Sequence, residues 1–330
     1  DLIFEEEPHK YYLHGKEIMC VSNVVHMFQP HFDVDTMAQR TYERNYNNEQ
    51  SKYYRMTPEM IKEVWAKISN DACSHGTERH EFAESVFYFM TNQLDKILDQ
   101  FQDRLSYDEH NQPVFLAKDP KEIAAATFYE DLPDSLFPIL AETKVYNEEL
   151  GYSGTFDLLM YYDAPIDGKD DRYSGLCVMD WKTNRDLYKN FKDQRLLHPF
   201  QDLQDMPLSI YKLQLSLYQL CLEKIGLKTI ARRIMWLMPD GTYEKLPLES
   251  YTKQLEEELG IRLFDRIGHT VRLTDKGHDA LLHAQQICHM CREMVLQSDH
   301  SDTLRGTIRL ATADSMCGPL VSGHFPDFST

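Results

Sequence analysis

Hydrophobic and polar residues alternate in short runs at the start of the chain. Runs at 2–4 and 10–13 have the pattern of strands, a His14-Gly15 turn follows, and another run covers 17–21. Period-two alternation interrupted by a turn is typical of antiparallel strands. The sequence therefore predicts a β-hairpin here.

The next region has a helical period. Residues 57–59, Thr-Pro-Glu, form a good helix start, with a capping Thr, Pro in the first turn and an acid after it. We expect residues 74–76, Ser-His-Gly, to interrupt the helix, and a second helix to run from about 77 to 105. The apolar stripe of this second helix includes Phe82, Val86, Phe87 and Met90.

From residue 139 the pattern becomes that of strands, with a polar loop expected at 163–174. The predicted strands cover 139–146, 154–162 and 175–182. An amphipathic helix at 207–225, closed by Gly226, precedes a strand at 231–238 and a turn at 239–241. This order of elements predicts an α/β core with a mixed sheet.

The bulk composition narrows the class of protein. A chain of 330 residues with 42% hydrophobic and 27% charged residues is globular and can hold one large domain or two. No stretch approaches the ~20 apolar residues that cross a bilayer, so we expect no membrane association. The acidic start does not resemble a signal peptide. Seven scattered cysteines do not suggest a disulfide framework, so we expect a reducing, cytoplasmic location.

The net charge of −18 argues against a protein that coats nucleic acid through bulk electrostatics. It leaves room for an enzyme that handles a phosphodiester locally, because a carboxylate-built metal site is itself acidic. A nucleic-acid substrate would then be held by the metal and a few local Lys and Arg residues.

The chemistry of the chain centres on two predicted strands. Asp157 follows Gly154 at the start of one, and Asp180-Trp181-Lys182 ends another. Side chains alternate across a strand, so Asp180 and Lys182 point to the same face and Trp181 to the other. An acid and a lysine at the end of a buried apolar strand are costly unless they serve a divalent cation and a phosphate. Carboxylates hold Mg²⁺ or Mn²⁺, which activates water and steadies the leaving oxygen, while a lysine stabilises charge in the transition state.

These residues resemble the PD-(D/E)XK nuclease core. Residues 76–80, Gly-Thr-Glu-Arg-His, and 214–218, Gln-Leu-Ser-Leu-Tyr, resemble the G-x-x-x-H and Gln-x-x-x-Tyr helices of its RecB-like exonuclease branch. Residues 7–12 resemble the opening hairpin of phage-type members, and the resemblance spans about residues 4–248. It implies a restriction-endonuclease-like mixed sheet flanked by helices, with a helical N-terminal insertion.

The resemblance also implies roles. His80, Asp157 and Asp180 would bind Mg²⁺ or Mn²⁺ (one or two ions) with the backbone carbonyl of Trp181, and Lys182 would position the attacking water. The implied activity is hydrolysis of DNA, favouring an exonuclease, in phage or bacterial DNA processing or recombination. Gln214 and Tyr218 would contact the substrate backbone or lie in the second shell. Glu142 would lie in the second shell, and the loop cations would meet substrate phosphates: Lys189, Lys192 and Arg195.

Each residue also has a plainer interpretation. Asp157 would be an acid in a surface turn, and Asp180 and Lys182 a solvated pair worth under about 1 kcal/mol. His80 would be a helix-surface histidine, and Gln214 and Tyr218 the polar flank of a packed helix. The loop cations Lys189, Lys192 and Arg195 would be solvated. A zinc site at Cys288 and Cys291, with His278 and His283 nearby, is disfavoured because all four lie on one predicted helix.

From about residue 251 the character of the chain changes. Three segments resemble parts of the LysR-type transcriptional regulators: 254–266, 271–277 and 306–310. In that family the first two cover the end of the recognition helix, the wing and the start of the linker helix, and the third is the first strand of the effector domain. We therefore expect a nuclease domain at 1–248 and a partial winged-helix and linker segment at 249–330.

The LysR-like segment is incomplete. Nuclease-like sequence stands where the first helix and most of the helix-turn-helix should be, and eight Lys/Arg face twelve Asp/Glu from residue 249 on. Two hypotheses follow: a DNA-tethering or dimerising appendage, or a passenger without complete function, which we favour. The alternative to the nuclease is a LysR-type DNA-binding regulator fused to an unrelated start. A homo-oligomer is compatible with both, but the form of the oligomer stays open, because the nuclease resemblance suggests a ring and the LysR resemblance suggests a dimer.

Overall fold

The computed structural model describes residues 2–5, 10–165, 172–190, 193–260, 264–267 and 270–273, the last two ranges as backbone only. The chain divides into compact units at 1–272 and 273–330, and all described residues except Leu273 belong to the first. Several predicted features lie outside the described residues: Lys192, residues 7–9 of the hairpin motif, the cysteine and histidine cluster at 278–291, and segments 274–277 and 306–310.

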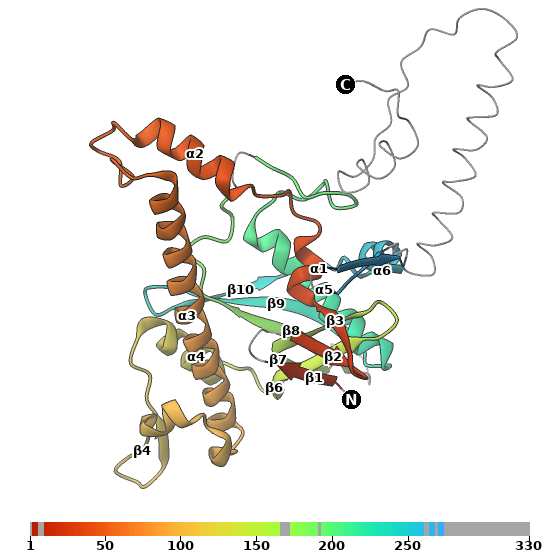
Figure 1. The fold of residues 1–330 in the computed structure, drawn as a ribbon. Coiled ribbons are helices and arrows are strands. Elements are labelled where there is room, and N and C mark those ends of the chain that lie inside the picture. Colours follow the sequence, from red (N-terminus) through yellow and green to blue (C-terminus); the bar gives the residue numbers. More distant parts are fainter. Residues whose placement is uncertain are drawn as a thin grey trace, which may run out of the picture. The chain divides into compact units, whose positions relative to one another are not determined.

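A mixed eight-stranded sheet forms the centre of this unit (Figure 1). Its order is β1-β2-β3-β7-β8-β9-β10, with β6 paired to β7. β3 with β7 and β8 with β9 are parallel pairs, and the others are antiparallel. The predicted α/β class and mixed sheet are confirmed. The strands are β1 (Leu2–Glu5), β2 (Lys10–Leu13), β3 (Lys16–Cys20), β6 (Leu136–Asn147), β7 (Tyr152–Pro165), β8 (Arg172–Lys182), β9 (Thr229–Leu237) and β10 (Tyr243–Pro247).

Helices cover both faces of the sheet, and side chains from alternate strand positions form two cores. Val178 belongs to the core beneath α1, α5 and α6, whereas Met179 belongs to the core beneath α3 and α4. α2 packs on α3 (Figure 1). The helices are α1 (Val21–His26), α2 (Val34–Asn45), α3 (Pro58–Met90), α4 (Pro120–Glu130), α5 (Pro207–Lys224) and α6 (Thr252–Gly260). Smaller elements are the 3₁₀ helices η1 (Leu94–Lys96) and η2 (Asp99–Arg104) and the two-stranded sheets β4 (Leu105–Tyr107) with β5 (Pro113–Phe115) and β11 (Phe264–Ile267) with β12 (Thr270–Leu273).

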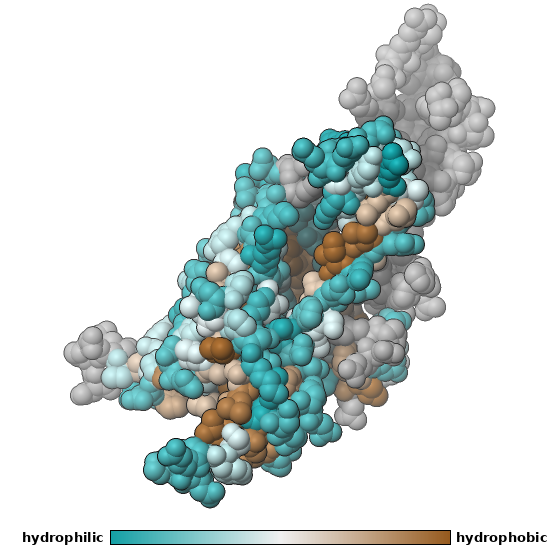
Figure 2. Space-filling view, turned by 90° about the vertical axis from the view of Figure 1, so that its left-hand side faces the viewer, coloured by the Kyte–Doolittle hydropathy of each residue, from teal (hydrophilic) through white to brown (hydrophobic). Residues whose placement is uncertain are grey.

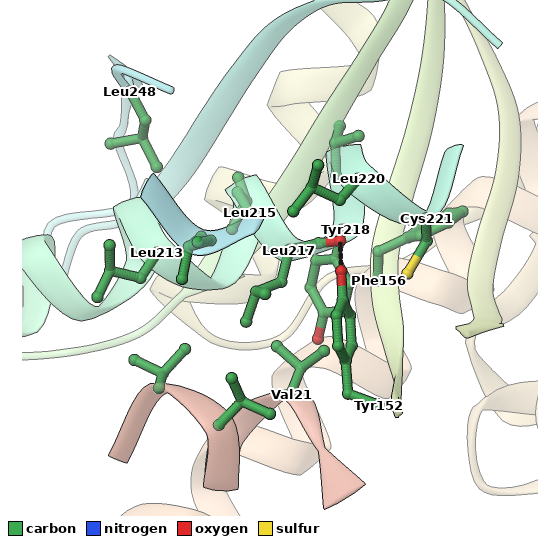
Figure 3. Close-up of a cluster of buried hydrophobic side chains, with 14 of the residues drawn as sticks. Val21, Tyr152, Phe156, Leu213, Leu215, Leu217, Tyr218, Leu220, Cys221 and Leu248 are labelled. Carbon is green, nitrogen blue, oxygen red and sulfur yellow. Dashed lines mark hydrogen bonds between the residues drawn. The ribbon is translucent and has the colours of Figure 1, made fainter. Parts of the chain in front are cut away.

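Gly154 allows α1 and α5 to approach β7 closely. A Cβ at this position would lie 2.9 Å from Tyr218 Cε1 and 2.9 Å from Val21 Cγ2. Figure 3 shows Leu217 of α5 and Val21 of α1 pointing toward each other, and the Tyr152 hydroxyl donating to the Leu217 carbonyl at 2.8 Å. The glycine was expected at the start of the strand, but β7 begins at Tyr152, so Gly154 lies within it and admits neighbouring side chains.

On the opposite face, Trp181 is buried against the aromatic side chains of α4. Its ring makes an edge contact with Phe128, with centroids 5.1 Å apart. A buried ion pair fixes the neighbouring η2, because Arg104 Nη1 lies 3.0 Å from Glu122 Oε2 and Nη2 lies 3.2 Å from Oε1. Two-point pairing satisfies both charges in a place where one alone would be costly. These contacts hold α4, and the loop before it, against the end of β8.

α3 corrects one sequence-based expectation. It is continuous from Pro58 to Met90 across Gly76, and it ends well before residue 105. Thr57 caps it as predicted, accepting a bond from the Met60 amide. A single glycine costs a helix only about 1 kcal/mol, which the buried positions at 82, 83, 86 and 87 offset. Met90, assigned to the apolar stripe, is 45% exposed.

The face that carries α3 is predominantly hydrophilic, with apolar side chains gathered in separate patches (Figure 2). Scattered patches of this kind are normal on a protein surface. Within the described part of the chain, no helix combines the length and apolar composition needed to cross a membrane.

α6 belongs to the compact unit although it follows the expected boundary at residue 248. Leu255 and Leu259 are buried in the α5 core, and the Tyr251 amide donates to Ser216 Oγ at 3.0 Å. The compact unit ends at 272 instead. The predicted boundary at 248 separates the nuclease-like sequence from the LysR-like sequence, and this division of the sequence stays a prediction.

Candidate metal centre

Three carboxylates stand in one row across neighbouring strands. The β7–β8 pairing ends at Leu158 and Met179, and one further step in register places Asp157 opposite Asp180. The β6–β7 register places Glu142 opposite Asp157, since the pairs on either side are Ala141 with Leu158 and Thr143 with Phe156. Residues directly opposite one another in an antiparallel pair project to the same face. The site therefore forms where β8 parts from β7, next to an irregular position of β6.

Glu142 has an unusual backbone conformation, with φ of +43°. A non-glycine residue in the left-handed region costs on the order of 1 kcal/mol or more and is held there by its surroundings. Such outliers cluster at functional sites. The half-buried Glu142 side chain supplies a carboxylate to the group described next.

α3 brings a histidine over this row. His80 Nδ1 lies 3.1 Å from Asp157 Oδ2. Ligand atoms of His80, Glu142 and Asp157 all lie within 4.8 Å of one another, a spacing that could hold one metal ion. Asp180 is outside this three-residue group, and its carboxylate pairs with Lys182. The geometry thus gives Glu142, expected in the second shell, a position from which it can contact a metal directly.

The backbone of β8 orients Asp157. The Trp181 amide donates to Asp157 Oδ2 at 2.7 Å, a bond that uses an amide lying past the end of the β7–β8 pairing. The predicted use of the Trp181 carbonyl as a metal ligand stays a prediction. Asp157 is not an acid in a surface turn, since it is only 9% exposed and lies inside β7.

Lys182 and Asp180 point to the same face, as the alternation of β8 predicts, and form an ion pair. Asp180 is 1% exposed, and no backbone amide or neutral side chain in the described part of the chain donates a hydrogen bond to its carboxylate, which leaves the Lys182 ammonium as its close partner. The Lys182 ammonium also lies 4.4 Å from the centre of the Tyr211 ring. The interpretation of this pair as a solvated surface contact does not fit such burial.

The electrostatics of the cluster show an excess of negative charge. Burial, and then the charge of Asp157, raises the pKa of Asp180 to about 7. Burial also raises the pKa of Glu142 to about 9, and Asp157 and Glu84 add to this effect. Burial raises the pKa of Asp157, but the charges of His80 and Lys182 have the larger effect and lower the pKa to about 2. One carboxylate of the row is thus strongly favoured as an anion while its neighbours resist ionisation, a pattern that an added cation would relieve.

Gln214 and Tyr218 lie on one face of α5, as their spacing predicts. Gln214 Nε2 lies 3.2 Å from the Tyr218 hydroxyl. Tyr218 is 4% exposed and packs on Gly154, and burial followed by the charge of Asp180 raises its pKa. Because Tyr218 is buried against β7, its position favours a role in packing beneath the strands of the acidic row over direct contact with a substrate.

The two predicted loop cations that the structure describes lie on the surface. Arg195 Nη1 donates to the carbonyls of Gln201 and Asp202 at 3.2 and 3.0 Å, so it braces its own loop. Lys189 is exposed. Neither lines the cavity next to the cluster, whose walls include Lys121, Lys182, Arg185 and Tyr211. Sequence reasoning missed Lys121 and Tyr211, which carry no motif of their own and reach the site only through tertiary packing.

Comparison with known proteins identifies no family for the whole chain. No protein-family model matches it. A 75-residue segment is 31% identical to the uncharacterized HTH-type transcriptional regulator YwqM of Bacillus subtilis (strain 168). The segment is 23% of this chain and covers 26% of that regulator, so the two share about a quarter of their lengths.

Proposed function

We propose that the compact unit is a Mg²⁺- or Mn²⁺-dependent deoxyribonuclease with a PD-(D/E)XK core of the RecB-like branch, acting as an exonuclease on linear DNA. One observation carries the proposal: a buried row of carboxylates across β6, β7 and β8 lies beside a lysine two residues beyond the last acid. The order of these groups along the chain, with a histidine from a preceding helix, is the order that the family resemblance implies.

The residues present fit a divalent cation. Carboxylate oxygens and one imidazole nitrogen are donors that Mg²⁺ and Mn²⁺ accept. Glu142, Asp157 and His80 offer such atoms within 4.8 Å of one another. Asp180 adds a buried carboxylate that receives no hydrogen bond from a backbone amide or a neutral side chain among the described residues, and the cations that lower its pKa are Lys182 and His80. A buried acid in this condition is costly unless a cation completes its surroundings.

The side chains divide the chemistry between them. When bound, a divalent ion lowers the pKa of a bound water and offsets charge on the phosphoryl oxygens. Lys182, held between Asp180 and the Tyr211 ring, orients the attacking water and stabilises charge as it grows on the phosphate. The Trp181 amide donates to Asp157 and fixes its orientation, while His80 offers a further ligand atom beside it.

A cleavage assay tests the proposal. End-labelled linear DNA is incubated with the full chain in Mn²⁺, in Mg²⁺ and in EDTA. We expect mononucleotide or short products that depend on the metal, and a loss of at least about 100-fold in rate for Asp180→Asn and for Lys182→Gln. Asp163→Asn is the matched control, because this acid lies on β7 six residues beyond Asp157 and pairs with Arg172. Full activity in Asp180→Asn or Lys182→Gln would remove the mechanism.

A second function is DNA binding by the LysR-like segment near the end of the chain, and the partial similarity to an HTH-type transcriptional regulator of Bacillus subtilis favours it. α6 followed by the two-stranded β11–β12 sheet has the order expected for the end of a recognition helix and a wing. Against it, α6 buries Leu255 and Leu259 under α5, and its exposed side carries Glu256 and Glu257. Acidic side chains on an exposed helix face oppose contact with phosphates.

DNA binding in EDTA separates the two functions, because a regulator of this kind needs no metal ion to bind. The probe is a fluorescein-labelled 40-base-pair duplex in a gel-shift assay with the full chain. Binding in EDTA that is lost in Arg262→Gln/Arg266→Gln/Arg272→Gln, while metal-dependent cleavage persists, supports the second function. Equal binding by the triple variant and the unaltered chain would contradict it.

A further inference from the structure

A cavity of about 840 Å³ opens beside the acidic row. Its walls come from the middle of α3, the start of α4, the segment that follows β8, and the β9–β10 turn at Pro239. His80 and Lys182 belong to both the cavity and the cluster, so a ligand in the cavity reaches the proposed metal centre. If a DNA strand places its scissile phosphodiester at Lys182, the nucleotides next to that phosphodiester therefore lie in this cavity.

The charge of the cavity wall is opposite to that of the chain. Four cationic side chains and one acid line it, although the whole chain carries a net charge of −18. The acid, Asp119, is already paired, since its Oδ2 lies 2.7 Å from Arg79 Nη2. Lys182 is paired with Asp180. The remaining cations are Lys121 and Arg185.

Both remaining cations lack an acidic partner within the described residues. Lys121 donates to the carbonyl of Thr183 at 2.6 Å, and this carbonyl directly follows Lys182 in the chain. Arg185, three residues after Lys182, is exposed and makes no hydrogen bond or ion pair with the part of the chain that the structure describes. Two cations without acids, on two different elements, face one volume.

The surroundings of Lys121 give independent support. Burial, and then the nearby charge of Arg79, lowers its pKa. A cation that is partly removed from water next to another cation gains when an anion arrives. A phosphate group offers such an anion with oxygens for more than one donor.

We propose that Lys121 and Arg185 bind a backbone phosphate of the DNA strand next to the phosphate that is cut, and so set the register of the strand over Lys182. The proposal rests on the proposed nuclease function and deepens it. Phosphate contacts of this kind fix position and orientation without reading sequence. They also explain how a strongly acidic chain holds a polyanion, because two local cations act where the metal centre needs the strand.

The test uses the full chain and a fluorescein-labelled 20-nucleotide DNA in Mn²⁺, with kcat and KM measured at several NaCl concentrations. We expect Lys121→Gln and Arg185→Gln each to raise KM about tenfold with kcat nearly unchanged, as for the loss of one charged hydrogen bond. The slope of log(kcat/KM) against log[NaCl] should become less steep in each variant, by about the amount that one phosphate contact contributes. A purely structural role would not change the salt dependence in this way.

Two controls match the charges removed. Lys253→Gln removes a lysine whose side chain is 86% exposed on α6. Arg172→Gln removes an arginine at the opposite end of β8 from Lys182, on the order of 30 Å away along the strand. Both controls should keep the KM and the salt dependence of the unaltered chain.

Substrates with single neutral methylphosphonate linkages identify which phosphate is bound. For the unaltered chain, a methylphosphonate at one internal position should raise KM about tenfold. In Arg185→Gln the same substitution should raise KM little further, because the contact with that phosphate is already lost. If instead only removal of a 5′-terminal phosphate has this effect, the bound group is a terminal phosphate and the internal assignment is wrong.

The outcomes separate this inference from the function on which it rests. Metal-dependent cleavage with KM and salt dependence of both variants equal to those of the controls would overturn the phosphate site and leave the nuclease standing. Absence of both binding and cleavage of the 20-nucleotide DNA by the unaltered chain would overturn both.

Discussion

Asp157 illustrates how single residues define this site. Its carboxylate accepts a bond from the Trp181 amide and contacts His80, and it stands between Glu142 and Asp180 on the adjacent strands. One side chain thus links α3 with three strands. Because hard oxygen donors and an imidazole converge there, the most direct question at this scale is which of them bind a metal.

Loss of single donors should weaken Mn²⁺ binding in titration calorimetry, which does not depend on activity. We expect His80→Ala, Glu142→Gln and Asp157→Asn each to reduce affinity by more than about tenfold, because each removes one of the converging ligand atoms. Glu84→Gln, one helical turn beyond His80 and bonded to Tyr88, should have a smaller effect. Asp163→Asn is the control. A Glu142→Gln variant that binds Mn²⁺ like the unaltered chain would return Glu142 to a supporting role.

The cysteines give a second residue-scale prediction, one that follows from pKa. Burial raises the pKa of Cys177 to about 11 and that of Cys221 to about 12, so at pH 8 roughly one part in a thousand or less of either is thiolate. Cys73 is exposed at the cavity wall. Of these three cysteines, iodoacetamide at pH 8 should therefore modify Cys73 first, and Cys177 and Cys221 only in urea, as measured by peptide mass spectrometry. Equal rates for Cys73 and Cys177 in native buffer would show that the core around β8 is open.

At the scale of elements, the sequence predicted most of what positions the site. The hairpin, the strands of the acidic row and α5 were predicted because their periods are strong and their turns carry Gly or Pro. The break at Gly76 was wrong, because packing of α3 on its neighbours outweighs the local propensity of one glycine. The position of Glu142 in the metal group could not be predicted, since it depends on the register of β6 with β7 and on an irregular backbone.

The two glycines of the recognised motifs should respond to alanine in opposite directions. At Gly76 a Cβ would lie 3.6 Å from Thr183 Oγ1, an ordinary contact, so Gly76→Ala should raise the free energy of unfolding by about 0.5–1 kcal/mol. At Gly154 the Cβ would lie 2.9 Å from Tyr218 and Val21, so Gly154→Ala should lower it by about 1–3 kcal/mol. Urea titration followed by circular dichroism measures both. Destabilisation by Gly76→Ala would mean that α3 approaches the β8 end more closely than described.

At the scale of the whole molecule, two sequence resemblances meet within one compact unit. Residues resembling a nuclease end at about 248, but the unit continues to 272 and includes α6. α6 contributes Leu255 and Leu259 to the same core as α5, and α5 supports the acidic row through Tyr218. The part of the chain that resembles LysR regulators therefore includes a helix on which the proposed active site depends for packing, and the passenger hypothesis does not extend to α6.

Leu255→Ala tests this dependence. Leu255 is 0% exposed, so its truncation should lower the free energy of unfolding of the full chain by about 2–5 kcal/mol, through lost burial and a cavity beneath α5. Leu227→Ala, at a leucine that is 42% exposed, should change it by no more than about 0.5 kcal/mol. Urea unfolding monitored by tryptophan fluorescence is a suitable measurement, because Trp181 and Trp236 are buried in the sheet. If both variants unfold like the unaltered chain, α6 does not pack on α5 in solution, and residues 1–248 alone should then suffice for the nuclease.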